Sequence, residues 1–259
     1  MKNKLILITG GSSGIGKATA KELVNLGNTI VIQARNPEKL STAAKEIDSS
    51  GERIYFYSTD LTSLSDVEIN ANKIITKHGI PDIIINSAGA GEWLSFNEAN
   101  NHHFKDTINS PYIATALTCK VFYDKMKLRG TGHFIIINSA ACFFSFSGSV
   151  GYTAARWALL GFAKSLQADL YDSNFNISMV ALGKVDSPYF KNNPISESKI
   201  PKLVNWLVPT LSVNEAAKII VKTTKSKKRI IIKPFIMRFF VGFNKFFPNL
   251  LKWLIRVTG

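Results

Sequence analysis

The stretch that decides the fold is T-G-G-S-S-G-I-G, at residues 9–16. It follows an apolar run at residues 4–9 and precedes a helix-like run at residues 17–26. Gly10, Gly14 and Gly16 let the backbone turn sharply out of a strand and bring its N–H groups close to a pyrophosphate at a helix N-terminus. Because a glycine cluster alone is often an ordinary turn, its meaning depends on the segments that follow.

Apolar, β-branched runs recur along the chain in a pattern typical of buried parallel strands. We expect strands at residues 4–9, 29–34, 53–58, 81–86, 132–138, 175–181 and 229–232. Helix-like segments separate them, at residues 17–26, 37–47, 64–78, 104–108, 152–171 and 212–222. For a chain of 259 residues, this alternation predicts one three-layer α/β/α domain with a Rossmann-type, doubly wound parallel sheet.

The positions of the cysteines and histidines indicate the redox state of the compartment and whether a metal site is expected. Cys119 and Cys142 lie inside apolar runs, and no Cys/His cluster has metal-ligand spacing. We therefore expect a reducing, cytoplasmic compartment and no metal site. The four histidines are scattered and are expected at the surface or in loops: His78, His102, His103 and His133. No apolar run approaches the roughly 20 residues of a membrane-spanning helix.

The end of the second predicted strand bears on the choice of dinucleotide. In dinucleotide-binding folds an acid at this point accepts from the ribose 2′-hydroxyl, whereas an arginine pairs with a 2′-phosphate. Ala34 and Arg35 offer no acid, which favours NADP(H) over NAD(H). The alternative is that Arg35 is a solvated loop cation.

The form T-G-x-x-x-G-I-G resembles the short-chain dehydrogenase/reductase (SDR) family, and later segments extend the resemblance over residues 4–232. N-S-A-G at residues 86–89 stands for the family's Asn-Asn-Ala-Gly, and L-G-K-V-D-S at residues 182–187 has Leu182 in place of a proline. The resemblance also implies that the Asp60 carboxylate binds the adenine amino group. Together the matches imply a cofactor site of Gly10, Ser12, Ser13, Gly14, Ile15, Gly16, Arg35, Asp60, Asn86, Ala88, Gly89, Tyr152, Arg156, Gly183, Val185 and Ser187.

Three side chains form the candidate catalytic group. Ser139 follows the fifth predicted strand, at the sheet edge where open α/β folds bind ligands. Tyr152 and Arg156 are four residues apart and project from one face of a helix. Carbonyl reduction needs an acid and a group that holds the oxygen. Tyr152 suits the first task, because an adjacent cation favours phenolate, and Ser139 suits the second.

The tyrosine motif departs from the family pattern at one position. The family has Tyr-x-x-x-Lys, whereas this chain reads Y-T-A-A-R at residues 152–156. Arginine keeps the charge, but it is planar and bulkier and does not release its proton. The family also keeps an asparagine at a helix kink, where a freed carbonyl holds a relay water. Asn109, before Ser-Pro, matches that position, although such an asparagine is often a helix cap.

Residues 188–209 are expected to form a mobile substrate lid. The segment mixes prolines, serines and lysines with Ile200, Leu203, Trp206 and Leu207. These apolar residues favour a hydrophobic or lipid-like substrate.

The tail, residues 233–259, is expected to form two short basic amphipathic helices that meet at Pro248. The chain has a net charge of +14, and residues 216–259 hold eleven Lys or Arg and no Asp or Glu. Helices of this kind lie in an anionic membrane interface. Equally, their apolar faces could cover the core or a partner subunit. A nucleic-acid site is not expected, because the cations alternate with apolar area.

The sequence thus predicts an NADP(H)-binding SDR domain at residues 1–232, lid included, followed by the tail. The predicted activity is hydride transfer between NADP(H) and a carbonyl or alcohol substrate. One rival is a dinucleotide-binding scaffold or sensor that lost turnover through Arg156, and another is a membrane-tethering protein. The resemblance implies a homo-dimer or homo-tetramer formed through the helices after the fourth and fifth strands.

Overall fold

The apolar runs form one parallel sheet in the computed structural model, which describes residues 2–89 and 91–257. Within those residues the sheet has seven strands in the order β3-β2-β1-β4-β5-β6-β9. The strands are β1 (Leu5–Thr9), β2 (Thr29–Ala34), β3 (Ile54–Ser58), β4 (Ile83–Asn86), β5 (Gly132–Ser139), β6 (Phe175–Leu182) and β9 (Ile230–Lys233). All neighbouring strands are paired in parallel. This confirms the predicted doubly wound sheet.

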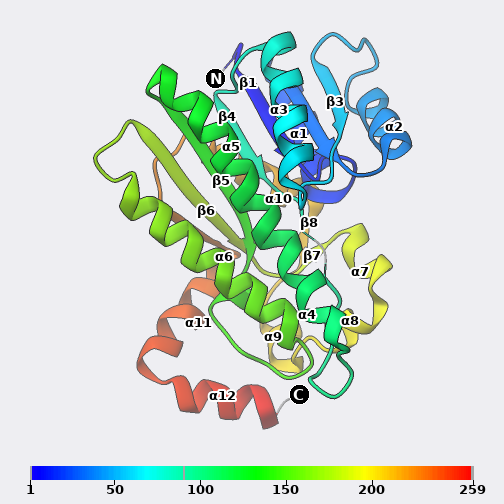
Figure 1. Cartoon of the computed structure of the whole chain (residues 1–259). Helices are drawn as coiled ribbons and strands as arrows, with labels where there is room; N and C mark the ends of the chain where they lie inside the picture. The colour runs from blue at the N-terminus through cyan, green and yellow to red at the C-terminus, as the bar shows by residue number, and fades with distance from the viewer. Residues whose placement is uncertain (1, 90, 258–259) are drawn as a thin grey trace.

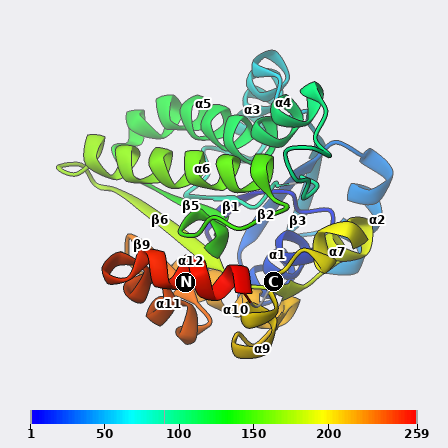
Figure 2. The same cartoon turned by 90° about the horizontal axis from the view of Figure 1, so that it is seen from below.

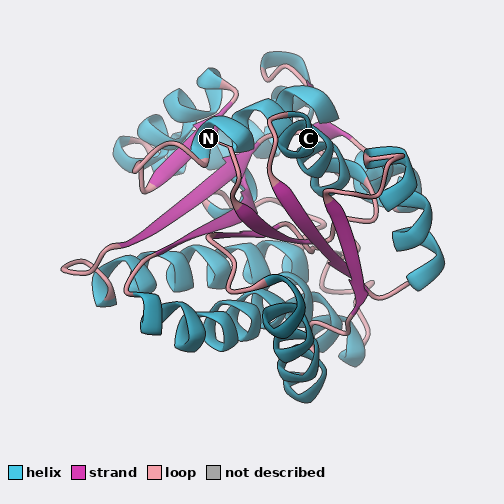
Figure 3. Cartoon of the chain, turned by 90° about the horizontal axis from the view of Figure 1, so that it is seen from above, coloured by secondary structure: helices cyan, strands magenta, loops and turns pink. Residues whose placement is uncertain are grey.

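Helices cover both faces of the sheet, which makes three layers (Figures 1 and 3). One face carries α1 (Gly14–Asn25), α2 (Pro37–Ile47) and α10 (Val213–Thr223), and the other carries α3 (Leu64–His78), α5 (Ala114–Arg129) and α6 (Val150–Asp169). In β1, Ile6 and Ile8 are buried in the first layer and Leu7 in the second. Burial of both faces explains the continuous apolar runs. Each such side chain contributes about 1.5–3 kcal/mol.

Element boundaries differ from the prediction by a few residues. The first helix begins at Gly14 rather than residue 17, because two of the loop glycines already belong to its first turn. β5 and β6 each run one residue further, to Ser139 and Leu182. α6 begins at Val150, so Tyr152 lies in its first turn.

A kink separates α4 (Asn101–Ile108) from α5. The five residues between them, Asn109–Ile113, form a wide π-helical turn, and Ser110 has non-helical backbone angles. Pro111, which cannot donate a backbone hydrogen bond, accounts for the break. A helix kink is therefore present at the position that the family resemblance implies.

Two histidines are buried, so the expectation of surface positions is wrong for them. His103 on α4 and His133 on β5 are each less than one-tenth exposed. The His133 ring nitrogen Nε2 lies 3.0 Å from the Ser178 hydroxyl on β6. This contact gives both buried side chains a polar partner on the neighbouring strand. The residues around His133 and Ser178 in sequence are largely apolar, so the sequence pattern shows a strand but does not reveal the pair.

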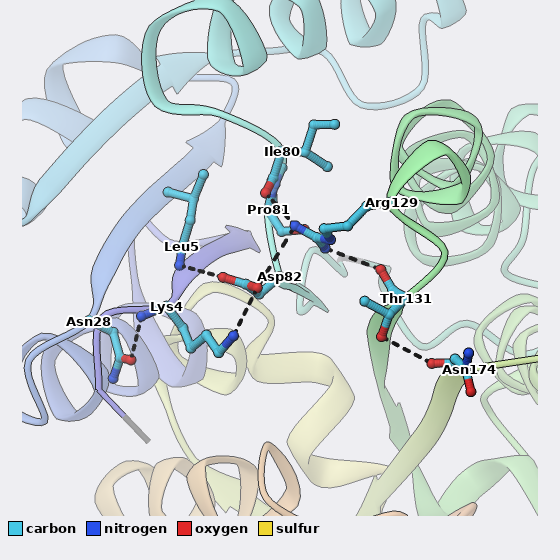
Figure 4. A network of polar contacts seen from close by, with 9 residues as sticks. All are labelled: Lys4, Leu5, Asn28, Ile80, Pro81, Asp82, Arg129, Thr131 and Asn174. Atoms are coloured by element: carbon cyan, nitrogen blue, oxygen red, sulfur yellow. Dashed lines mark hydrogen bonds and ion pairs between the residues drawn. The ribbon is translucent and has the colours of Figure 1, made fainter.

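A polar network joins the amino ends of β1 and β4 to the end of α5 (Figure 4). The Asp82 carboxylate accepts from the Leu5 backbone N–H at 3.0 Å and pairs with Lys4 Nζ at 3.1 Å. Arg129 donates to the carbonyls of Ile80 at 2.9 Å and Pro81 at 2.7 Å. The network fixes the sheet at the edge away from the candidate site.

The lid segment, residues 188–209, is largely helical. It contains α7 (Pro188–Asn192), α8 (Pro194–Ser198) and α9 (Lys202–Leu207). Two of these helices start at a proline, a residue suited to the first helical position. β7 (Val185–Asp186) precedes the lid and pairs in parallel with β8 (Leu211–Ser212), which follows it. The two ends of the lid are therefore joined.

The tail consists of α11 (Phe235–Phe246) and α12 (Pro248–Val257). Both helices lie at the lid edge of the sheet, and α12 contacts α9 (Figures 1 and 2). Met237 and Leu251 are buried, and Met237 packs on Ala140 and Val208. Among the described residues, every helix is too short or too polar to cross a bilayer.

Candidate active site

A cavity of about 910 Å³ lies at the carboxyl edge of the sheet. The glycine loop and the ends of β2, β4, β5 and β6 form one side of it, and the lid and tail form another. Sixteen of the eighteen residues predicted for the site line this cavity. They are Gly10, Ser12, Ser13, Gly14, Ile15, Gly16, Arg35, Asp60, Ala88, Gly89, Ser139, Tyr152, Arg156, Gly183, Val185 and Ser187. Asn86 and Asn109 are the two that do not.

The glycine loop has a shape that side chains would destroy. Gly10 has a φ of +69°, and a Cβ there would lie 2.9 Å from the Ser87 carbonyl oxygen. A Cβ on Gly16 would lie 2.3 Å from the Gly10 carbonyl oxygen. Ser13 caps α1 without a side-chain hydrogen bond, so the loop presents a helix N-terminus to the cavity. This cradle fits the pyrophosphate of a dinucleotide.

Arg35 and Asp60 line the cavity at the ends of β2 and β3. The Asp60 oxygen Oδ1 accepts from the Thr62 N–H at 3.0 Å and from its hydroxyl at 2.7 Å. These bonds, with the attraction of Arg35, lower the pKa of Asp60. Ser63 caps α3 by accepting from Asp66 N–H. The Asp60 carboxylate is thus not the helix cap, although Thr62 already occupies one of its oxygens.

The segment after β4 divides between the cavity and the core. Ala88 and Gly89 line the cavity, and the Thr9 hydroxyl accepts from the Ala88 N–H at 3.1 Å. Asn86 instead donates to Cys119 Sγ at 3.3 Å. Asn86 therefore joins β4 to α5 and lies behind the cavity wall.

Ser139, Tyr152 and Arg156 all line the cavity. The Arg156 guanidinium carbon lies 4.8 Å from the centroid of the Tyr152 ring. A Cβ on Gly89 would lie 3.1 Å from an Arg156 terminal nitrogen, so a residue without a side chain gives the arginine room. Ser139 is held by a 3.2 Å hydrogen bond from the Ala141 N–H to its oxygen.

Arg156 is buried, and its Nε makes no hydrogen bond within the described residues. No described carboxylate pairs with it either. A buried cation is costly without polar partners. The Tyr152 ring supplies one favourable contact. An unpaired donor in a cavity wall fits a site whose remaining polar partners come from a bound ligand.

Asn109 lies at the start of the π-helical turn, next to the cavity-lining Ser110. Its carbonyl accepts from the Ala114 N–H across that turn. Asn100 is the N-cap of α4 and accepts from His103 N–H at 2.9 Å, whereas Asn109 is the C-cap of the same helix. The kink expected at Asn109 is present, and the role of its carbonyl in a water relay stays a prediction.

The other side of the cavity is apolar, and sequence analysis missed most of it. Trp93 is buried with its ring centroid 5.0 Å from that of Tyr152 and 5.1 Å from that of Phe146. Further lining residues are Phe144, Tyr189, Phe190, Ile200, Leu203, Val204, Met237, Phe240, Leu251 and Ile255. Two features of the sequence could have indicated this apolar wall. They are the run F-F-S-F at residues 143–146 and the helical spacing of the apolar tail residues.

The lid is attached to the segment that carries Trp93. The Ser196 hydroxyl accepts from the Trp93 N–H at 3.0 Å, and Lys199 Nζ donates to the Trp93 carbonyl at 3.0 Å. Lys199 also pairs with Glu98, and this bond is the main reason that the pKa of Glu98 falls to about 2. Tyr189 donates to the Gly91 carbonyl. Hydrogen bonds therefore join the lid to the part of the cavity wall that lies beside Tyr152.

A Rossmann-type sheet with this glycine loop and this serine, tyrosine and cation defines an oxidoreductase that uses a nicotinamide dinucleotide. The chain belongs to the short-chain dehydrogenase family, whose model matches residues 4–197. Members act on CH–OH and C=O groups.

Individual relatives agree with this assignment. A 3-dehydrosphinganine reductase of Danio rerio is 28% identical over 222 residues, which are 84% of this chain and 67% of that protein. The solved structure of ElxO with NADP bound is 26% identical, with a TM-score of 0.79 over 90% of this chain and 97% of that one. A Burkholderia phymatum short chain dehydrogenase/reductase, solved with NAD, has the same fold at 18% identity, with a TM-score of 0.84 over 97% and 96% of the two chains.

Proposed function

We propose that the protein is an NADP(H)-dependent reductase of a carbonyl group in a hydrophobic, lipid-like substrate, and a dehydrogenase of the matching alcohol in reverse. The observation that carries the proposal is the shared cavity: Ser139, Tyr152 and Arg156 line it together with an aromatic and aliphatic wall. Acid, oxygen-holding group and cation thus face the space available to an apolar substrate.

When bound, the cofactor supplies hydride to the carbonyl carbon or accepts it from the alcohol. Tyr152 donates its hydroxyl proton to the developing alkoxide, and Ser139 donates a hydrogen bond to the same oxygen. The Arg156 charge beside the ring stabilises the phenolate that remains. Since arginine holds its proton, Tyr152 recovers a proton from water that enters the cavity rather than from Arg156.

NADP(H) is proposed over NAD(H) on the strength of Arg35. It lines the cavity at the end of β2, with Asn36 and Lys39 beside it and no acid at that strand end. A guanidinium suits a 2′-phosphate better than a neutral ribose hydroxyl. The NADP complex of ElxO is consistent with this preference.

A long-chain substrate is proposed from the cavity wall. Trp93, Phe190 and Ile200 lie near Tyr152, and the tail residues Leu251 and Ile255 extend the wall. Such a lining suits an alkyl chain that carries a ketone. The similarity to a protein named 3-dehydrosphinganine reductase supports the same substrate class.

For assembly and location, we propose a cytoplasmic homo-dimer or homo-tetramer that binds a membrane peripherally through residues 233–259. The free, buried thiols of Cys119 and Cys142 suit a reducing compartment. α5 and α6 offer the subunit contact, and Trp157 on α6 is 48% exposed.

The test is NADPH oxidation, followed by absorbance over a panel of short- and long-chain ketones, with cofactor binding measured separately by fluorescence. We expect NADPH binding and turnover, faster with long chains, and a Tyr152→Phe variant that binds NADPH without turnover. A protein that binds NADPH, reduces none of the ketones and gains activity from Arg156→Lys would instead be a dinucleotide-binding scaffold.

A further inference from the structure

The two tail helices carry apolar side chains on both faces. On α12, Leu251 and Ile255 are one turn apart and line the cavity. Leu250 and Trp253 lie on the other side of the helix and are 45% and 57% exposed. Apolar side chains on a second face of a helix need an apolar neighbour of their own. Within the described residues, the cavity wall and the rest of the fold cover only the inner side of the helix.

α11 repeats this arrangement. Met237 and Phe240 line the cavity, whereas Phe239 and Phe246 are 61% and 79% exposed. The ring of Phe239 stacks on that of Phe243 with the centroids 6.1 Å apart, and Phe247, just after the helix, lies 5.2 Å from Phe243 in a tilted arrangement. Together the two helices present an outer tail face of exposed apolar residues: Phe235, Phe239, Phe246, Phe247, Leu250, Trp253 and Val257.

The charges around this face are all of one sign. Arg238, Lys245, Lys252 and Arg256 are exposed on the two helices, and residues 216–259 contain no acid. Apolar side chains flanked by cations match the acyl chains and headgroups of an anionic bilayer. A second copy of the chain would bring the same cations against them, and like charges disfavour that contact.

The helices have the dimensions of interfacial rather than spanning elements. α11 has 12 residues and α12 has 10, so their lengths are about 18 and 15 Å at 1.5 Å per residue. A bilayer core is about 30 Å thick. Helices of these lengths lie in the plane of the interface, with the apolar face buried and cations near the headgroups.

We propose that the outer tail face docks on an anionic lipid bilayer and that the catalytic cavity receives its substrate from that bilayer, past the inner side of the same helices. The first half specifies the face and the lipid for the proposed peripheral binding, and the second half rests on the proposed function, because it takes an apolar carbonyl substrate as the occupant of the cavity. α12 contacts α9 of the lid, where Trp206 is 82% exposed. The lid and the tail thus meet next to the outer tail face, which is the face proposed to enter the membrane interface.

Flotation of the full chain with vesicles tests the docking. We expect binding to vesicles of phosphatidylcholine with phosphatidylglycerol, and binding at least about tenfold weaker to phosphatidylcholine alone, since each cation near an anionic surface contributes several-fold. The pair Phe247→Ser and Trp253→Ser is expected to weaken binding about tenfold or more. The matched pair Leu128→Ser and Tyr171→Ser removes two side chains that are 84% and 66% exposed elsewhere, and should leave binding unchanged.

Charge reversal separates a specific face from a general basic attraction. Lys245→Glu with Lys252→Glu should weaken flotation more than tenfold, whereas Lys225→Glu with Lys227→Glu, outside the two helices, should have a much smaller effect. Equal losses from both pairs would overturn the proposal. So would absence of flotation, or light scattering that shows a dimer dissociated by Trp253→Ser, since a second copy would then cover this face.

Activity assays separate this inference from the proposed function. The same protein preparation is assayed with two substrates. One is a short water-soluble ketone, and the other is a long-chain ketone held in anionic vesicles. Loss of both activities refutes the proposed function. Reduction of the short ketone without faster reduction of the vesicle-held ketone refutes only the present inference. The Phe247→Ser and Trp253→Ser protein, altered outside the cavity wall, should reduce the short ketone at the normal rate and the vesicle-held ketone about tenfold more slowly.

Discussion

The guanidinium of Arg156 lies over the ring of Tyr152, with its central carbon 4.8 Å from the ring centroid. Both residues are buried in the cavity wall. A fixed cation in this position attracts negative charge that develops on the ring oxygen during the reaction. The charge that the family pattern takes from lysine is therefore present here, supplied by a group that cannot exchange its proton.

This contact predicts the effect of removing the charge on alcohol oxidation, in which Tyr152 acts as a base. In Arg156→Met the ring loses the cation 4.8 Å from its centroid, so negative charge on the tyrosine oxygen in the transition state loses its electrostatic partner. We expect kcat/KM for alcohol oxidation to fall about tenfold or more. The measurement is kcat/KM at neutral pH. Lys164→Met, on the exposed side of the same helix, should leave kcat/KM unchanged.

Close approach of backbone segments predicts the effect of a methyl group in the glycine loop. In Gly16→Ala the new Cβ would lie 2.3 Å from the Gly10 carbonyl oxygen, which is backbone and cannot swing aside. NADPH binding should be lost, and the melting temperature should fall. Gly161→Ala is the control, because its Cβ meets no atom within 4 Å and alanine favours a helix by about 1 kcal/mol. A Gly16→Ala protein with normal NADPH affinity would contradict the proposed cradle.

Cofactor preference should depend on Arg35. Arg35→Asp replaces a cation by an acid that can accept from a ribose 2′-hydroxyl. A charged hydrogen bond contributes about 1.5–3 kcal/mol, so the ratio of kcat/KM for NADPH to that for NADH should fall at least about tenfold. Lys45→Asp, on the exposed part of α2, makes the same charge change outside the cavity. Equal effects of the two variants would show that general electrostatics, not Arg35, sets the preference.

Buried His133 makes stability sensitive to acid. Burial lowers its pKa to about 4, whereas an unfolded histidine titrates near 6.5. The unfolded state therefore binds the proton first, so stability from this group is complete above about pH 6.5 and is lost as pH falls toward 4. At pH 4.5 the loss should be about 2–3 kcal/mol relative to pH 7. His133→Gln, which does not titrate, should reduce the decline by about that amount in urea unfolding, and an unchanged decline would refute this origin.

The sheet and the cofactor side of the site could be predicted from the sequence because their signals are local. Residues 30–32 are apolar throughout, since both faces of the strand are covered. Gly16 is required by its close approach to Gly10 within one loop, and Gly10 is favoured by its own positive φ. Each requirement leaves its mark on a few consecutive residues.

The apolar wall could not be predicted in the same way, because it is assembled from distant segments. The rings of Phe146, Tyr152 and Phe190 meet around Trp93, which lies far from them in sequence. Asn86 shows the reverse case: its motif position implied the cofactor, whereas its side chain is used by Cys119. Residue type and spacing identify strand ends, and only the packed fold decides which side chains there face the cavity.

Lys199 provides a test of whether the lid positions the wall beside Tyr152. Its ammonium donates to the Trp93 carbonyl at 3.0 Å and pairs with Glu98, and Trp93 packs on the Tyr152 ring. In Lys199→Met the lid loses this link, so Trp93 should be less well fixed. Because Glu98 is about half exposed and such pairs are weakened by solvent, we expect KM for a ketone to rise only about threefold to tenfold, with NADPH affinity unchanged. Lys199→Arg should preserve the link, and Lys202→Met, an exposed position on α9, should behave as the unaltered protein. A fall in kcat without a change in KM would assign Lys199 a role other than holding the lid.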